Sequence, residues 1–135
     1  MAEVRVAPRA RPLSPHLLHW RWHVTLAASI TNRLTGGATY LGMLILAGWA
    51  LALASGPDAY AGYMSVIGSL PGKVVMFGLT FALFFHLAGG LRHLFWDFGR
   101  GLRPSVADAT AWGSYVFALT ATIAVWGAAA GMGVL

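Results

Sequence analysis

The sequence contains no cysteine and few charged residues. Without cysteine the chain forms no disulfide and offers no thiolate ligands to an iron–sulfur cluster, so any such cluster would belong to a partner chain. Charged residues make up only 10% of the chain and hydrophobic residues make up 58%. This balance excludes an ordinary soluble globular domain and indicates a membrane protein.

Three long stretches contain no charged residue: residues 34–57, 74–91 and 109–135. Each is close to the length of about 17 to 25 residues that crosses the roughly 30 Å hydrocarbon layer as a helix. We therefore predict an all-α integral membrane fold with three transmembrane helices, at about residues 23–54, 73–98 and 110–133. Glycine and proline near residues 56 and 71 predict that the segment between the first two helices is an interfacial loop.

The basic residues are distributed unevenly about these stretches. Five arginines precede the first stretch and three follow the second, whereas the first loop holds only Lys73. By the positive-inside rule this asymmetry places the N-terminus on the cytoplasmic side and the C-terminus on the periplasmic side. The net charge of +5 is therefore explained by topology, and we expect no nucleic-acid partner.

Residues 1–22 form the first of two predicted regions, a cytoplasmic surface segment, and residues 23–135 form the transmembrane anchor domain. Pro8, Pro12 and Pro15 remove amide donors and fix the backbone, which predicts an extended conformation for the first region. Trp20 and Trp22 flank Arg21, an arrangement suited to the lipid headgroup zone.

His86 is the most informative residue, because it lies within the second uncharged stretch. An ionisable group at that depth is costly and is a candidate functional residue. Ligation of haem iron would satisfy it, and so would a hydrogen bond to a hydroxyl or carbonyl group. His16, His19 and His23 lie at or before the membrane entrance, so a second axial ligand is expected from another chain.

His93 lies seven residues after His86, about 10 Å further along the same helix, so the two cannot hold opposite faces of one iron. It could equally pair with Asp97 or be solvated. Small residues at positions 78, 82, 89 and 90 predict close approach of another helix or a flat cofactor to this helix. Gly127 and Gly131 predict helix packing in the third helix.

Ser29 and Arg33 lie one helical turn apart, with Asn32 beside them. A hydroxyl donor and a fixed cation at the membrane boundary suit a quinone, whose carbonyl oxygens accept hydrogen bonds and whose reduced forms need positive charge nearby. In the alternative interpretation, Arg33 extends to lipid phosphates and Ser29 bonds its own backbone.

Two motifs resemble the cytochrome b-type large membrane-anchor subunit of succinate dehydrogenase. The first begins at residues 11–13 (Arg-Pro-Leu), includes Leu17 and Val24, and ends at residues 29–35 (Ser-Ile-Thr-Asn-Arg-Leu-Thr). The second is residues 86–99 (His-Leu-Ala-Gly-Gly-Leu-Arg-His-Leu-Phe-Trp-Asp-Phe-Gly). The run Ser-Pro-His-Leu at residues 14–17 is similar to the mitochondrial and alphaproteobacterial branch. We expect a bacterial inner (plasma) membrane location.

The resemblance implies that His86 is an axial ligand of haem b and that the small membrane-anchor subunit supplies the other ligand within a shared helix bundle. It implies that Ser29 and Arg33 line a ubiquinone site near the iron–sulfur subunit, and that Arg33 and His93 lie close to the haem propionates. Asn32 stands where many relatives have histidine, which weakens any role carried over to that position.

The resemblance also implies that this chain does not oxidise succinate itself. It would anchor the flavoprotein and the iron–sulfur subunit, and electrons from succinate would reach ubiquinone at the site it helps to form. Two alternatives stay open: a purely structural anchor with no redox role, and an anchor for a quinol:fumarate reductase.

Overall fold

A computed structural model describes residues 21–135, which contain four α-helices. They are α1 (Val24–Ala54), α2 (Pro57–Ile67), α3 (Leu70–Asp97) and α4 (Pro104–Gly131). The three long helices α1, α3 and α4 are apolar and long enough to cross a membrane, which confirms the predicted helical membrane fold. The predicted extended segment, apart from residues 21 and 22, and the histidines at positions 16 and 19 lie outside the described residues.

Helix α2 replaces the interfacial loop predicted between the first two spans, so that prediction was wrong. The helix follows Gly56, whose φ of 107° is a conformation that suits glycine. Pro57 occupies the first helical position, where its missing amide hydrogen is not needed, and Asp58 lies in the first turn near the positive end of the helix dipole. These residues stop α1 and also start α2.

Helices α3 and α4 begin three and six residues before the predicted starts, at Leu70 and Pro104. In both cases a proline lies within the first two helical positions, where it is tolerated. The Ser69 hydroxyl oxygen accepts a hydrogen bond from the Gly72 amide at 3.2 Å, which caps α3. Pro71, which we interpreted as a breaker, therefore belongs to the helix that follows it, as Pro57 does.

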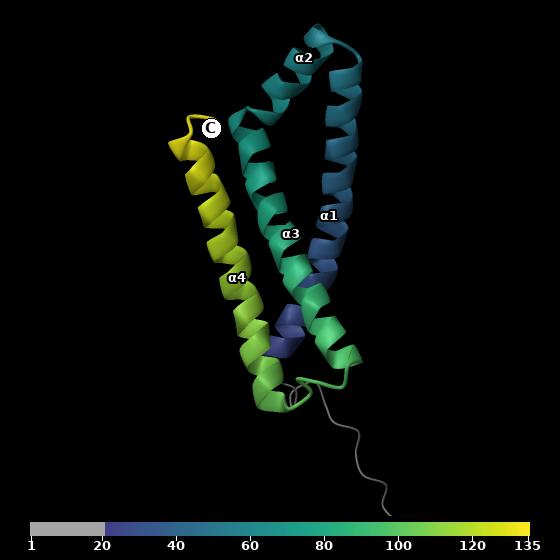
Figure 1. Cartoon of the computed structure of the whole chain (residues 1–135), viewed down its shortest axis with the longest axis vertical. Coiled ribbons are helices and arrows are strands. Elements are labelled where there is room, and N and C mark those ends of the chain that lie inside the picture. Colours follow the sequence, from purple (N-terminus) through teal and green to yellow (C-terminus); the bar gives the residue numbers. More distant parts are fainter. Residues whose placement is uncertain (1–20) are drawn as a thin grey trace, which may run out of the picture.

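Helix α3 packs against both α1 and α4, and α1 diverges from α3 towards the end of the bundle where α2 joins them (Figure 1). The buried core lies nearer the opposite end, where α1 begins. It consists of Ala28, Phe85, Ala111 and Ala118, with Phe81, Phe84 and Tyr115 packed around it. The Phe85 and Tyr115 ring centroids are 4.6 Å apart.

The small residues of α3 divide between two faces. Ala82 and Gly89 are buried with Phe85, whereas a Cβ added at Gly78 or Gly90 would have no atom of the described chain within 4 Å apart from nearby backbone of its own helix. In α4 the buried seam is formed by residues Ala111, Ser114, Ala118 and Thr122. Gly127 and Gly131 likewise have open space around them in the described chain, so the packing predicted there is not made within it.

Candidate functional site

The His86 imidazole is held against α1. Its Nδ1 lies 3.1 Å from the main-chain oxygen of Asn32. A carbonyl oxygen can only accept, so Nδ1 carries the proton of the neutral ring and Nε2 keeps its lone pair. Residue 86 is exposed on the surface of the described chain. One nitrogen is therefore satisfied within the chain, and the other has the chemistry of a metal ligand.

This geometry fits the histidine donor that haem iron requires. Metal-binding imidazoles generally donate their second N–H to a carbonyl or carboxylate, which fixes the tautomer and raises the basicity of the ligand. The hydrogen bond to the Asn32 carbonyl provides that partner. Residues 21–135 contain no group of three or more histidine, cysteine or acidic side chains that could hold a metal ion.

Ser29 and Arg33 lie on the same face of α1 as the residues that contact His86. Their spacing relative to Asn32 and Gly36 is that of one helical face. The His86 ring contacts this face at Asn32 and Gly36. By helical spacing, the predicted quinone pair therefore lies on the face of α1 that contacts the predicted haem ligand.

The Ser29 side chain is half-buried and Arg33 is exposed. Hydroxyls further along α1 bond their own helix: Thr35 donates to the Asn32 oxygen at 3.0 Å and Thr39 to the Gly36 oxygen at 2.8 Å. Within the part of the chain that the structure describes, the Ser29 hydroxyl has no such bond. The alternative in which Ser29 bonds its own backbone is therefore not observed.

His93 is exposed, and its ring meets the Trp96 ring edge-on with a centroid separation of 5.1 Å. It makes no ion pair with Asp97: the ion pair observed in residues 21–135 joins His23 and Asp108. The alternative role of His93 as the partner of Asp97 is therefore not seen here.

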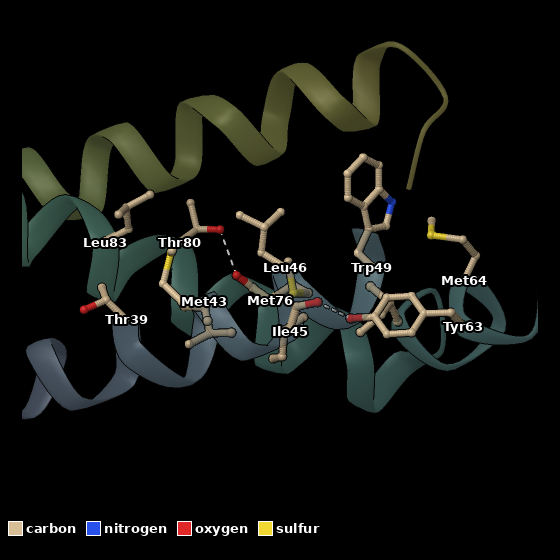
Figure 2. Close-up of a pocket in the computed structure, with 13 residues that line it drawn as sticks. Thr39, Met43, Ile45, Leu46, Trp49, Tyr63, Met64, Met76, Thr80 and Leu83 are labelled. Carbon is tan, nitrogen blue, oxygen red and sulfur yellow. Dashed lines mark hydrogen bonds between the residues drawn. The ribbon is translucent and has the colours of Figure 1, made fainter. Parts of the chain in front are cut away.

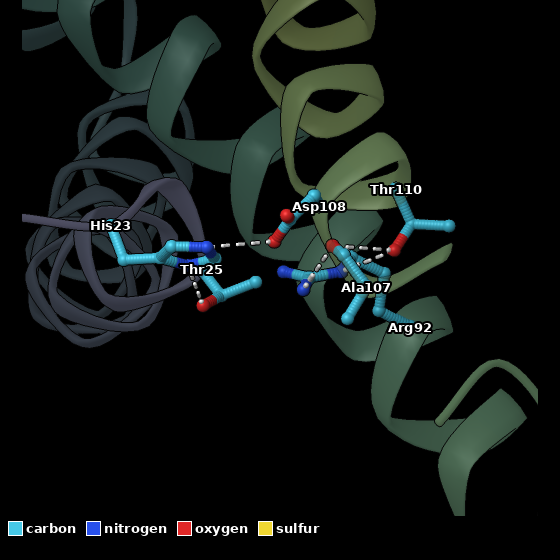
Figure 3. Close-up of polar contacts among 6 residues, drawn as sticks. All are labelled: His23, Thr25, Arg92, Ala107, Asp108 and Thr110. Carbon is cyan, nitrogen blue, oxygen red and sulfur yellow. Dashed lines mark hydrogen bonds and ion pairs between the residues drawn. The ribbon is translucent and has the colours of Figure 1, made fainter. Parts of the chain in front are cut away.

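A polar cluster that the sequence analysis did not predict joins α1, α3 and α4 (Figure 3). The His23 Nε2 lies 3.4 Å from the Asp108 carboxylate, and its Nδ1 lies 2.8 Å from the Thr25 hydroxyl. Arg92 reaches α4, where it donates to the Thr110 hydroxyl at 3.3 Å and the Ala107 carbonyl at 3.4 Å.

Arg92 also lies over the Trp96 ring, 4.8 Å from its centroid, a cation–π distance. Arg92 served in the sequence analysis as a marker of topology and as part of the second motif, and no contact was predicted for this residue. The residues that Arg92 bonds lie on the next helix. Residue spacing within one helix does not predict which residues of a neighbouring helix it meets. Only the turn between α3 and α4 brings them together.

A cavity of about 550 Å³ lies between α1, α2 and α3 at the other end of the molecule (Figure 2). Its walls carry methionine, leucine, isoleucine and tryptophan side chains. The Tyr63 hydroxyl donates to the Ile45 carbonyl at 2.6 Å and the Thr80 hydroxyl to the Met76 carbonyl at 2.7 Å. Because these hydroxyls are already bonded, the cavity offers mainly apolar surface, and none of the predicted site residues lines it.

The comparisons with known proteins agree with the helical arrangement. Residues 7–125 match the family described as succinate dehydrogenase/fumarate reductase transmembrane subunit. The chain is 41% identical to a succinate dehydrogenase cytochrome b556 subunit of Paracoccus denitrificans, over 68% of this chain and 71% of the relative.

A cytochrome b556 subunit of Rickettsia felis is 33% identical over 86% of this chain and 90% of the relative. The mitochondrial cytochrome b560 subunit of Sus scrofa is 36% identical over 82% of this chain and 65% of the relative. The matched region includes all of α1, α2 and α3, and most of α4. The chain belongs to the succinate dehydrogenase/fumarate reductase transmembrane subunit family.

Proposed function

We propose that this chain is a membrane-anchor subunit of succinate dehydrogenase that ligates haem b through His86 and forms part of the ubiquinone-reduction site. The observation that carries the proposal is the hydrogen bond from His86 Nδ1 to the Asn32 carbonyl, because it leaves Nε2 as the ligating nitrogen. The names of the relatives, succinate dehydrogenase cytochrome b556 and b560 subunits, support the same assignment.

Haem b supplies a one-electron redox centre when bound. His86 would hold the haem iron through Nε2, and the exposure of residue 86 leaves room for a small anchor subunit that would supply a second ligand. Arg33 lies on the face of α1 that contacts His86, and His93 lies two turns further along α3. A cation and an imidazole in these positions suit the negative charges of the haem propionates.

In this proposal, Ser29 and Arg33 bind ubiquinone and assist its reduction. The Ser29 hydroxyl donates a hydrogen bond to a quinone carbonyl oxygen, and the Arg33 guanidinium stabilises the negative charge that develops on the oxygen as electrons arrive. Ubiquinone is the substrate, and it takes up protons at the membrane boundary. Both residues lie in the first three turns of α1, near that boundary.

The proposed partners are the small anchor subunit, the iron–sulfur subunit and the flavoprotein. The soluble pair docks at the cytoplasmic end, where α1 begins and α3 ends. In the described chain this end carries Arg21, Arg33, Arg92, Arg100 and Arg103, whereas the α2 end carries Lys73. This asymmetry supports a cytoplasmic N-terminus and a periplasmic C-terminus in a bacterial inner membrane.

Substitution of His86 tests the proposal. We expect His86→Leu to remove the haem b absorption band from the purified complex or to alter it, because leucine offers no ligand. His23→Leu is a matched control, since His23 is held by Asp108 and Thr25 and should be dispensable for haem. An unaltered haem spectrum in the assembled His86→Leu complex would contradict axial ligation.

A further inference from the structure

Two glycines mark the point where α1 and α3 cross. A Cβ at Gly36 of α1 would lie 3.0 Å from Cε1 of His86 and 3.8 Å from its Nε2. A Cβ at Gly89 of α3 would overlap the Oδ1 of Asn32 and would lie 2.6 Å from its Cγ. Each helix therefore places one side chain against a glycine of the other: His86 against Gly36, and Asn32 against Gly89.

The same two residues are joined by the hydrogen bond from His86 Nδ1 to the Asn32 carbonyl, 3.1 Å long. The acceptor is a main-chain atom, so its distance from the imidazole is set by how closely the two backbones approach. The Asn32 Oδ1 is buried without a hydrogen-bond partner in the described part of the chain. The Asn32 side chain therefore contributes packing against Gly89 at this crossing.

The neighbouring glycines do not share these contacts. Gly37 follows Gly36 and Gly90 follows Gly89, and a Cβ added at either would have no atom of the described chain within 4 Å apart from nearby backbone of its own helix. The close approach is therefore a property of positions 36 and 89. It also provides a matched control for each of them, one residue away on the same helix.

We propose that Asn32, Gly36 and Gly89 are positioning residues that fix the orientation and tautomer of the His86 imidazole. This inference depends on the proposed function, in which His86 ligates haem. An imidazole whose second N–H donates to a carbonyl is a stronger electron donor to iron. A methyl group at position 36 pushes the ring away from α1 by a few tenths of an ångström, which lengthens that hydrogen bond and changes the orientation of the ring.

Gly36→Ala and Gly37→Ala, each made in the complete complex, test the role of Gly36. We expect Gly36→Ala to lose haem to an apo-haem acceptor protein about 10- to 100-fold faster, the range typical when the outer partner of a metal ligand is lost. Its haem midpoint potential should shift to more positive values, because weaker donation destabilises ferric iron. Gly37→Ala should match the wild type in both measurements.

Equal haem loss and equal potential in the two alanine variants would overturn the inference while leaving the proposed function intact. A wild-type complex without haem would instead overturn the proposed function. The two failures are therefore distinguishable by the spectrum of the unmodified complex.

A compensating pair of substitutions tests Asn32 and Gly89 even if the first variant assembles poorly. We expect Gly89→Ala to lower the haem content, because its methyl group overlaps the Asn32 side chain, whereas Gly90→Ala should not. Adding Asn32→Ala removes that overlap and should restore haem content and retention in the Asn32→Ala/Gly89→Ala double variant. If the double variant is no better than Gly89→Ala alone, the contact between the side chain at position 32 and Gly89 does not set how closely the two helices approach, and Gly89 is not a positioning residue.

Discussion

At the residue scale, the hydroxyl side chains in the transmembrane helices differ in what they bond. Most of them donate to a carbonyl of their own helix, as Thr122 does to the Ala118 oxygen at 2.6 Å. Such bonds satisfy a polar group where water is absent. Thr31 instead bonds the Tyr115 hydroxyl of α4 at 2.8 Å. Ser29 does neither within the described chain, which suits a hydroxyl that bonds a substrate.

Substitution of the two proposed quinone contacts should separate ubiquinone reduction from succinate oxidation. We expect Ser29→Ala to lower kcat/KM for ubiquinone by about 2- to 10-fold, since one hydrogen bond is worth about 0.5–1.5 kcal/mol. Arg33→Leu should lower it by about 10-fold or more, because bonds to charged groups are stronger. Succinate oxidation with an artificial acceptor should be unchanged in both.

Thr120→Ala is the control for these variants, because the Thr120 hydroxyl bonds its own helix at 2.8 Å and its residue is exposed on α4. Its ubiquinone kinetics should equal those of the wild type. Wild-type ubiquinone kinetics in both Ser29→Ala and Arg33→Leu would remove these residues from the quinone site.

At the element scale, α4 is held to the rest of the bundle by small side chains. Its seam of alanine, serine and threonine lets the backbone of α4 approach its neighbours closely. Further along, the Trp126 indole N–H donates to the Thr80 hydroxyl of α3 at 3.2 Å. Packing of the seam, together with the hydrogen bonds from α1 and α3, therefore sets the position of α4, and its geometry depends on the volume of the seam residues.

Enlarging one seam residue should destabilise the bundle. Ala118 is 0% exposed, so Ala118→Leu inserts a larger side chain where there is no space, at a cost of about 1–3 kcal/mol. Ala124→Leu, at an exposed position of the same helix, is the matched comparison and should destabilise the bundle less than Ala118→Leu does. The measurement is the dissociation temperature of the purified complex in detergent. Equal temperatures for Ala118→Leu and the wild type would show that the seam is not close-packed.

At the scale of the whole molecule, the distribution of charged and apolar side chains determines how the bundle sits in the membrane. The two ends of the bundle differ in charge, and α2 lies at the end with few basic residues (Figure 1). Most of the large apolar side chains of α1 are exposed in this chain, such as Leu34, Tyr40 and Leu51, at 70%, 68% and 69% exposure. Lipid or another membrane subunit must cover this surface.

The orientation can be measured directly, because the chain has no cysteine of its own. Ser65→Cys places a thiol on the exposed side of α2, and Ser105→Cys places one at the start of α4. We expect a membrane-impermeant maleimide to label this chain in intact spheroplasts at position 65. Position 105 should react from the cytoplasmic side, in inverted vesicles. Labelling of position 65 only in inverted vesicles would reverse the proposed topology.

The spans were predictable because each one is a local property of the chain. A membrane helix must be long and apolar whatever its neighbours are, so uncharged stretches identify it. The starts of α3 and α4 were predicted less well: Pro71 was interpreted as a breaker before its helix and the residues from Pro104 to Ala109 were left out of theirs, although both prolines lie in the first turn of a helix. Helix α2 was missed because eleven residues are too short to span and carry no clear signal in hydropathy.

The sequence by itself determined the number and nature of the long helices, and it identified His86 as an unusual residue, because hydropathy and the cost of a buried ionisable group act locally. Only the tertiary structure decided which imidazole nitrogen is hydrogen-bonded, that Asn32 and Gly36 meet His86, and that Arg92 reaches α4. These contacts depend on the crossing of helices that are far apart in the chain. Close approach of two backbones is set by the packing of both helices, which no pattern within one helix specifies.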